Sequence, residues 1–73
     1  MDNQQDFLMQ NIISEIIEYI VQDNKVDIPT ATKIWSESEF SNKLQDAETG
    51  LYLNGSAYVY ELFKEWQQQN KEN

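Results

Sequence analysis

The 73-residue sequence contains no cysteine and no histidine. Without cysteine the chain can form neither a disulfide nor a thiolate metal site. Without histidine it lacks the commonest metal ligand and the usual general base. We therefore expect no metal, no cofactor and no catalytic residue, and the sequence predicts a protein that is not an enzyme.

Arginine is also absent, and the five lysines stand apart from one another along the chain. Thirteen acidic residues against these lysines give a formal net charge of −8. Proteins that bind DNA or RNA need clustered cations to replace the counterions of the phosphates, so direct binding to nucleic acid is not expected. An acidic surface favours solubility, and it also fits a basic protein partner or mimicry of a nucleic acid.

Long apolar runs are missing as well. The longest covers only Ala57 to Tyr60, whereas a membrane-spanning helix needs about 20 apolar residues. The first residues, MDNQQDF, do not form the cationic and apolar pattern of a signal peptide. These features predict a cytoplasmic protein without membrane contact, and lysine without arginine, alongside many Asn and Ile, is typical of a low-GC bacterial genome.

The strongest helical pattern covers Gln4 to Asp23, a stretch without proline or glycine. Its apolar residues recur at helical spacing and occupy about half of the helix circumference. Such a helix packs on two neighbours, or it also faces another chain. We expect the side chains that pack inward to be Leu8, Ile12, Ile16 and Tyr19.

A second helix is expected from about Pro29, because proline suits a first helical turn and the residue before proline is pushed out of the helical region. It should carry Ala31, Ile34 and Trp35 inward.

The segment SESE, residues 36–39, matches a capping box in which Ser36 caps a third helix. That helix is expected from about Glu37 to Glu48, with Gly50 at the position where glycine often ends a helix. Its expected core residues are Phe40, Leu44 and Ala47.

The segment LYLNGSAYVYELFKEW, residues 51–66, fits two structures. Asn-Gly is a strong hairpin turn, which would make LYL a strand. After Ser56, however, the apolar residues recur at helical spacing. We therefore expect Ser56 to cap a helix over Ala57 to Gln68, with LYL as a short extended connector.

The aromatic residues of this segment also allow two interpretations. They can form a platform on which a sugar or a base stacks, made of Tyr52, Tyr58, Tyr60, Phe63 and Trp66. The simpler account is a core stripe along the last helix, since Tyr58, Leu62 and Trp66 are four residues apart. Val59 and Phe63 lie beside them on the helical wheel. Tyr60 falls between two polar residues on the helical wheel, and it is the aromatic expected to be most exposed.

Carboxylate pairs are the remaining candidates for acid–base chemistry. Glu15 and Glu18 are three apart, and Glu61 and Glu65 are four apart. All four fall on the polar faces of the expected helices, whereas a catalytic carboxylate needs burial or a like charge in a cleft. We expect these faces to be solvated.

Three segments, IISEIIEYIVQ, TATKIWSESEFSNKL and LYLNGSAYVYELFKEW, together resemble a family of small uncharacterised bacterial all-helical domains. The layout of that family is an aliphatic first helix, two short helices, and an extended connector into a final helix. The resemblance covers about Met9 to Trp66 and implies an all-α fold with no assigned activity. Some members carry a histidine in the connector, and this chain has none.

The sequence thus predicts one all-α domain over residues 1–73, a bundle of about four helices with frayed ends at about 1–4 and 68–73. We expect a non-catalytic protein-interaction or regulatory module, and the alternative is an acidic inhibitor that mimics nucleic acid to occupy a basic protein. One margin of the first helix should stay uncovered in so small a domain, which predicts a homodimer or another protein partner there. The expected interface residues are Phe7, Ile13, Ile17, Val21 and Tyr60.

Overall fold

The computed structural model describes residues 3–69, and it confirms the predicted small all-α fold. Two short 3-10 helices, Ala47–Thr49 (η1) and Leu51–Leu53 (η2), join the third α-helix to the fourth. The α-helices are Asn3–Asn24 (α1), Ile28–Glu37 (α2), Phe40–Gln45 (α3) and Ser56–Gln69 (α4). The frayed ends predicted for the chain fall partly on residues 1–2 and 70–73, outside the described residues, and they stay a prediction.

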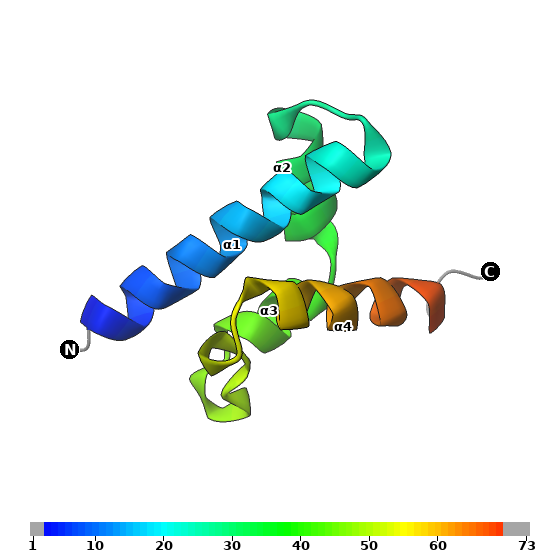
Figure 1. The fold of residues 1–73 in the computed structure, drawn as a ribbon. Helices are drawn as coiled ribbons and strands as arrows, with labels where there is room; N and C mark the ends of the chain where they lie inside the picture. The colour runs from blue at the N-terminus through cyan, green and yellow to red at the C-terminus, as the bar shows by residue number, and fades with distance from the viewer. Residues whose placement is uncertain (1–2, 70–73) are drawn as a thin grey trace.

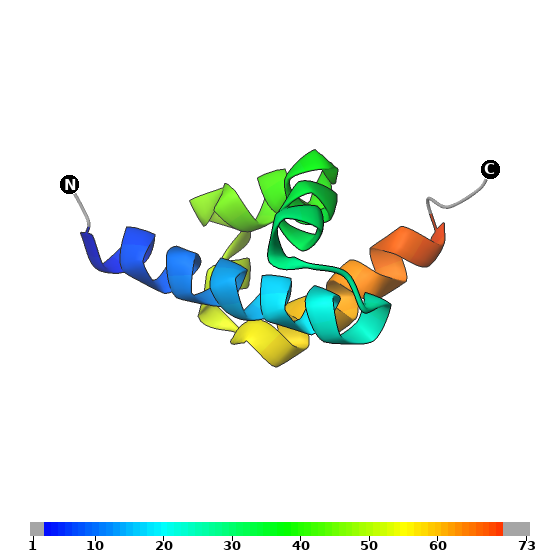
Figure 2. The ribbon, with the colours of Figure 1, turned by 90° about the horizontal axis from the view of Figure 1, so that it is seen from above.

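The helices pack around one half of α1. α1 crosses the molecule diagonally, with α2 behind its C-terminal half and α4 below it (Figure 1). Seen from above, α2 and α3 share one side of α1, and the start of α4 emerges on the other side (Figure 2). The N-terminal turns of α1 extend beyond the other helices in both views, so these turns have few neighbours to cover them.

The core forms where α1, from Ile12 onward, meets the three other helices. Phe63 of α4 is at its centre, because its ring centroid lies 5.1 Å from that of Trp35 and 5.8 Å from that of Phe40. Edge-on and tilted arrangements of this kind are the favourable geometry for aromatic pairs. The largest fully buried side chains are Phe63, Ile16, Ile20, Leu44 and Val59.

The chain leaves α1 through a left-handed residue. Lys25 has φ 55°, and the N–H of Val26 donates to the carbonyl of Val21 at 3.3 Å. This six-to-one hydrogen bond is the one that closes a Schellman motif, in which glycine usually holds the left-handed position. α1 therefore ends in a tight turn that leads directly into α2.

α2 begins at Ile28, one residue earlier than predicted. Asp27 has extended backbone, and its carboxylate accepts the N–H of Thr30 at 3.0 Å. Hydrogen bonding by the side chain and backbone of Thr30 holds the pKa of Asp27 below its ordinary value. Because Asp27 caps the helix, Ile28 is its first residue even though it precedes Pro29. Ala31 and Trp35 are buried as expected, and Ile34 is half-buried.

The predicted capping role of Ser36 is wrong. Ser36 lies inside α2, and its hydroxyl donates to the Lys33 carbonyl at 3.3 Å. Ser38 performs the role instead, since its buried hydroxyl accepts the N–H of Ser41 at 3.3 Å and donates to the Trp35 carbonyl at 2.7 Å. Ser38 is followed three residues later by Ser41 and not by a glutamate, so the capping-box pattern did not indicate it.

α3 ends at Gln45, three residues before the predicted end. The hydroxyl of Thr49 donates to the carbonyls of Lys43 at 2.9 Å and Asp46 at 2.8 Å, which folds the chain into η1. Gly50 is left-handed, with φ 69°, but it follows η1 and not α3. Phe40 and Leu44 are buried as predicted, and the expected burial of Ala47 falls outside the described side chains.

The connector before α4 is not extended. LYL forms η2, in which the N–H of Leu53 donates to the Gly50 carbonyl at 3.1 Å. Ser56 is the first residue of α4 and does not cap it, since the carbonyl of Gly55 accepts the N–H of Val59 at 3.2 Å. The Ser56 hydroxyl donates instead to the carboxylate of Glu15 on α1. A residue predicted to cap the start of α4 thus joins α4 to α1.

Candidate interaction surface

The buried face of α1 is rotated from the predicted one. Leu8 was expected inside, but it is 42% exposed because it lies in the turns that extend beyond the other helices. Tyr19 is half-buried. The buried face consists of Met9, Ile12, Ile16 and Ile20.

One margin of α1 carries four apolar residues, which we call the α1 flank: Phe7, Ile13, Ile17 and Val21. The last three are spaced by four residues, and the exposed polar residues Gln10 and Ser14 separate Phe7 from them. Ile13, Ile17 and Val21 are half-buried and pack against the core with their inner sides. Phe7 is 66% exposed. The flank contains four of the five residues predicted to form an interface, and the partner itself stays a prediction.

The opposite margin of α1 is covered by α4. The Ser56 hydroxyl reaches Glu15, and the ring of Tyr60 lies 5.0 Å from the ring of Tyr19. These contacts fix the side of α1 on which α4 packs, and the α1 flank is the margin that lies away from them on the helical wheel.

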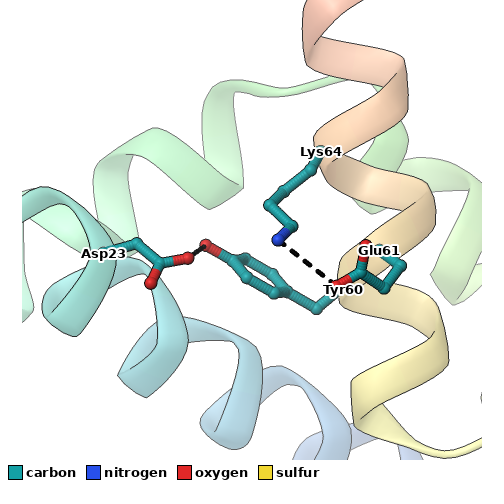
Figure 3. A network of polar contacts seen from close by, with 4 residues as sticks. All are labelled: Asp23, Tyr60, Glu61 and Lys64. Carbon is teal, nitrogen blue, oxygen red and sulfur yellow. Dashed lines mark hydrogen bonds and ion pairs between the residues drawn. The ribbon is translucent and has the colours of Figure 1, made fainter.

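The predicted exposure of Tyr60 is wrong. Its side chain is 7% exposed, and its hydroxyl donates to the carboxylate of Asp23 on α1 at 2.6 Å (Figure 3). The Lys64 ammonium lies 5.1 Å from the centre of the same ring and pairs with Glu61 at 3.3 Å. Tyr60 thus joins α4 to α1 inside the fold, and it is not available as an interface residue.

Burial, the hydrogen bond to Asp23 and the negative charges of Asp23 and Glu61 raise the pKa of Tyr60 well above its ordinary value of 10.0. The phenol therefore keeps its proton at neutral pH and acts as a hydrogen-bond donor. The wheel placed Tyr60 among polar residues, but a long aromatic side chain can lay its ring on the core while its hydroxyl reaches the surface. Nothing in the sequence of α4 indicates that Asp23 is the acceptor.

The aromatic residues of 52–66 do not form the stacking platform considered above. Tyr60 and Phe63 are buried in the core, whereas Tyr58 is 54% exposed on the outer side of α4. The predicted core stripe is confirmed at Val59 and Phe63, which are buried. Leu62 and Trp66 are half-buried, and Tyr58 lies outside the core.

A second candidate surface is a cleft of about 290 Å³ between α3, η2 and α4. Sequence reasoning missed this cleft, since it is assembled from three elements that are separated along the chain. Lys43 and Glu65 contribute opposite charges to its lining. The other lining residues are Phe40, Leu51, Leu62, Trp66 and Gln69.

The carboxylates considered for acid–base chemistry are exposed, as the helical wheels predicted. Glu15 accepts the Ser56 hydroxyl, and Glu61 pairs with Lys64. Among the residues that the structure describes, no group of three or more acidic side chains is placed to hold a metal ion. Glu15 and Glu61 thus have structural contacts within the fold.

Comparison with known proteins finds no matching family model, and no significant match among curated proteins or solved structures. The resemblance to small bacterial helical domains therefore stays a prediction. None of the helices within residues 3–69 has the length and apolar character needed to cross a membrane.

Proposed function

We propose that this chain is a non-catalytic protein-interaction module and that the α1 flank is its binding surface. The observation that supports this most directly is Phe7, a large apolar side chain left 66% exposed on a helix. It lies on the same margin of α1 as Ile13, Ile17 and Val21, which are themselves incompletely covered. Apolar side chains left uncovered on one side of a small domain are candidates for a binding surface.

The exposure of Phe7 has no structural role within the described fold. The side chain lies outside the core cluster and outside the group of partly buried residues packed against it. A phenylalanine side chain that stays in water does not stabilise the fold of its own chain. If a partner buries it, the burial contributes about 1.5–3 kcal/mol to the free energy of binding. The partner is another protein or a second copy of this chain.

Affinity capture tests the proposal. The tagged chain is exposed to lysate of its own source, and bound proteins are quantified for the wild type, Phe7→Gln and Tyr58→Gln. Tyr58 is the matched control, since it is also an exposed aromatic but lies on α4. A bound protein retained by Tyr58→Gln and lost with Phe7→Gln is the expected result. Identical capture by all three chains would overturn the proposal.

An acidic inhibitor that mimics nucleic acid is the second candidate, supported by the net charge of −8. Carboxylates in such an inhibitor replace phosphates, so a DNA duplex should compete for the captured protein. Displacement by the duplex, together with equal binding by Phe7→Gln, would favour this candidate over an apolar interface.

A further inference from the structure

We infer that the partner of the α1 flank is a cationic amphipathic helix and not a second copy of this chain. The inference rests on the proposed function and adds the chemistry of the partner. It follows from the distribution of charge along α1, which contains acidic side chains at Asp6, Glu15, Glu18 and Asp23 and no lysine between residues 3 and 24.

Two of these four carboxylates already have partners inside the fold. Asp23 accepts the Tyr60 hydroxyl, and Glu15 accepts the Ser56 hydroxyl. Asp6 and Glu18 are exposed, and neither makes an ion pair with another residue of the described chain. Asp6 and Glu18 are therefore the charges that α1 leaves open to a partner.

Both open charges lie on the side of α1 that carries the α1 flank. With successive residues turned by 100°, Asp6 falls inside the flank on the helical wheel, and Glu18 falls just beyond Phe7. The exposed polar residues Gln10 and Ser14 also fall inside this sector. The flank therefore combines apolar side chains with two carboxylates that have no partner in the described chain. In paired helices the charges beside the apolar residues choose the partner, so this surface is complementary to a helix that carries lysine or arginine beside its own apolar residues.

A second copy of the chain has the wrong charge for this surface. Two α1 helices packed along their flanks would bring acidic margins together without one lysine from either helix. The two chains together would carry twice the net charge of −8. Like charges placed against each other across an interface suppress that pairing, whereas a cationic helix is attracted by the same groups.

The size of the flank sets the length of the partner helix. Phe7 and Val21 are fourteen residues apart on α1, which corresponds to about 21 Å at 1.5 Å per residue. A helix of about four turns covers that length. A synthetic peptide of leucine and lysine, about 18 residues long and with leucine at the seam positions of a heptad, is therefore a sufficient probe.

Isothermal titration calorimetry with this peptide, at about 0.15 M salt to screen distant charges, tests the inference. We expect the wild type and Tyr58→Gln to bind it with similar Kd values, and Phe7→Gln to bind about tenfold more weakly, as for the loss of an aromatic anchor. A peptide with glutamate in place of lysine should not bind at the same concentrations.

The charge variants form the second arm of the test. Glu18→Gln should weaken binding several-fold and flatten its salt dependence, whereas Glu48→Gln, an exposed acid on η1, should change neither. Equal binding of the peptide by all variants would mean that the peptide is attracted only by the net charge of the chain. That result would overturn the inference.

Sedimentation equilibrium separates the inference from the proposed function. A wild-type dimer that becomes monomeric with Phe7→Gln would make the second copy the occupant, which overturns the cationic helix but preserves the interaction module. Capture that is insensitive to Phe7→Gln would instead remove the proposed function itself.

Discussion

The phenol of Tyr60 connects two helices through one hydrogen bond. The donor on α4 and the acceptor, Asp23 on α1, are 37 residues apart in the sequence and 2.6 Å apart in space. The ring also packs on Tyr19 and Phe63, with centroids at 5.0 and 6.2 Å. One side chain thus contributes both apolar burial and a directional contact that fixes how α4 crosses α1.

Tyr60→Phe removes the hydroxyl and keeps the ring. Because the acceptor is a carboxylate, we expect the free energy of unfolding to fall by about 1–2 kcal/mol. Urea denaturation measures this loss. Tyr58→Phe is the control, since Tyr58 is exposed and should change stability by less than about 0.5 kcal/mol. Equal stabilities of the two variants would contradict the role of the Tyr60 hydrogen bond.

The same hydroxyl predicts a loss of stability in alkaline solution. The pKa of Tyr60 is raised in the folded chain above its ordinary value of 10.0, so between those two values the folded state binds more protons than the unfolded state. Stability is then complete below about pH 10 and falls as the pH rises through that window. The urea midpoint of the wild type should fall more steeply above pH 10 than that of Tyr60→Phe. Parallel pH profiles would show that Tyr60 titrates normally.

At the scale of helices, the periodicity of apolar residues predicted most of what the structure shows. The bounds of α1, α2 and α4 lie within about a residue of the prediction at most ends, because each helix has an apolar stripe that local spacing reveals. The junction before α4 was wrong because a side chain there contacts a distant part of the chain. The local sequence around Ser56 matches a helix cap, yet the Ser56 hydroxyl donates a hydrogen bond to the carboxylate of Glu15.

Ser38→Ala tests the revised junction between α2 and α3. Its hydroxyl accepts from the Ser41 N–H and donates to the Trp35 carbonyl in a buried position, so its removal should cost about 1 kcal/mol, typical for the loss of a helix cap. Ser36→Ala is the matched control, because the Ser36 hydroxyl is exposed and bonds only within α2. Thermal unfolding should show a lower Tm for Ser38→Ala than for Ser36→Ala. The reverse order would restore the boundary predicted from the sequence.

For the whole molecule, the sequence predicted that α1 has more apolar surface than the core can bury. It did not predict which part of that surface the other helices cover. The apolar half of α1 identified Phe7, Ile13, Ile17 and Val21 as one margin, and the structure leaves that margin least covered at Phe7. The cleft between α3, η2 and α4 could not be predicted, since its lining depends on how three elements meet. The spacing of residues along one helix does not show how that helix packs against the other two elements.

Two phenylalanines allow a buried core position to be compared with an exposed one. Phe63 is 1% exposed at the centre of the core, and Phe63→Ala should cost about 3–5 kcal/mol. That loss is a large share of the roughly 4–11 kcal/mol expected for a chain of this length. Phe7→Ala, the same substitution at an exposed site, should cost less than about 1 kcal/mol. Circular dichroism with urea compares them, and a similar loss at both positions would place Phe7 in the core.

The position at which a cationic helix binds tests the central claim most directly. Backbone amide chemical shifts of the ¹⁵N-labelled chain are followed by NMR while the leucine–lysine peptide is added. The account predicts that the largest shifts occur along the α1 flank, from Phe7 through Ile13 and Ile17 to Val21, with little change around the cleft at Leu62. Shifts centred on the cleft, or spread evenly over every acidic segment, would contradict it.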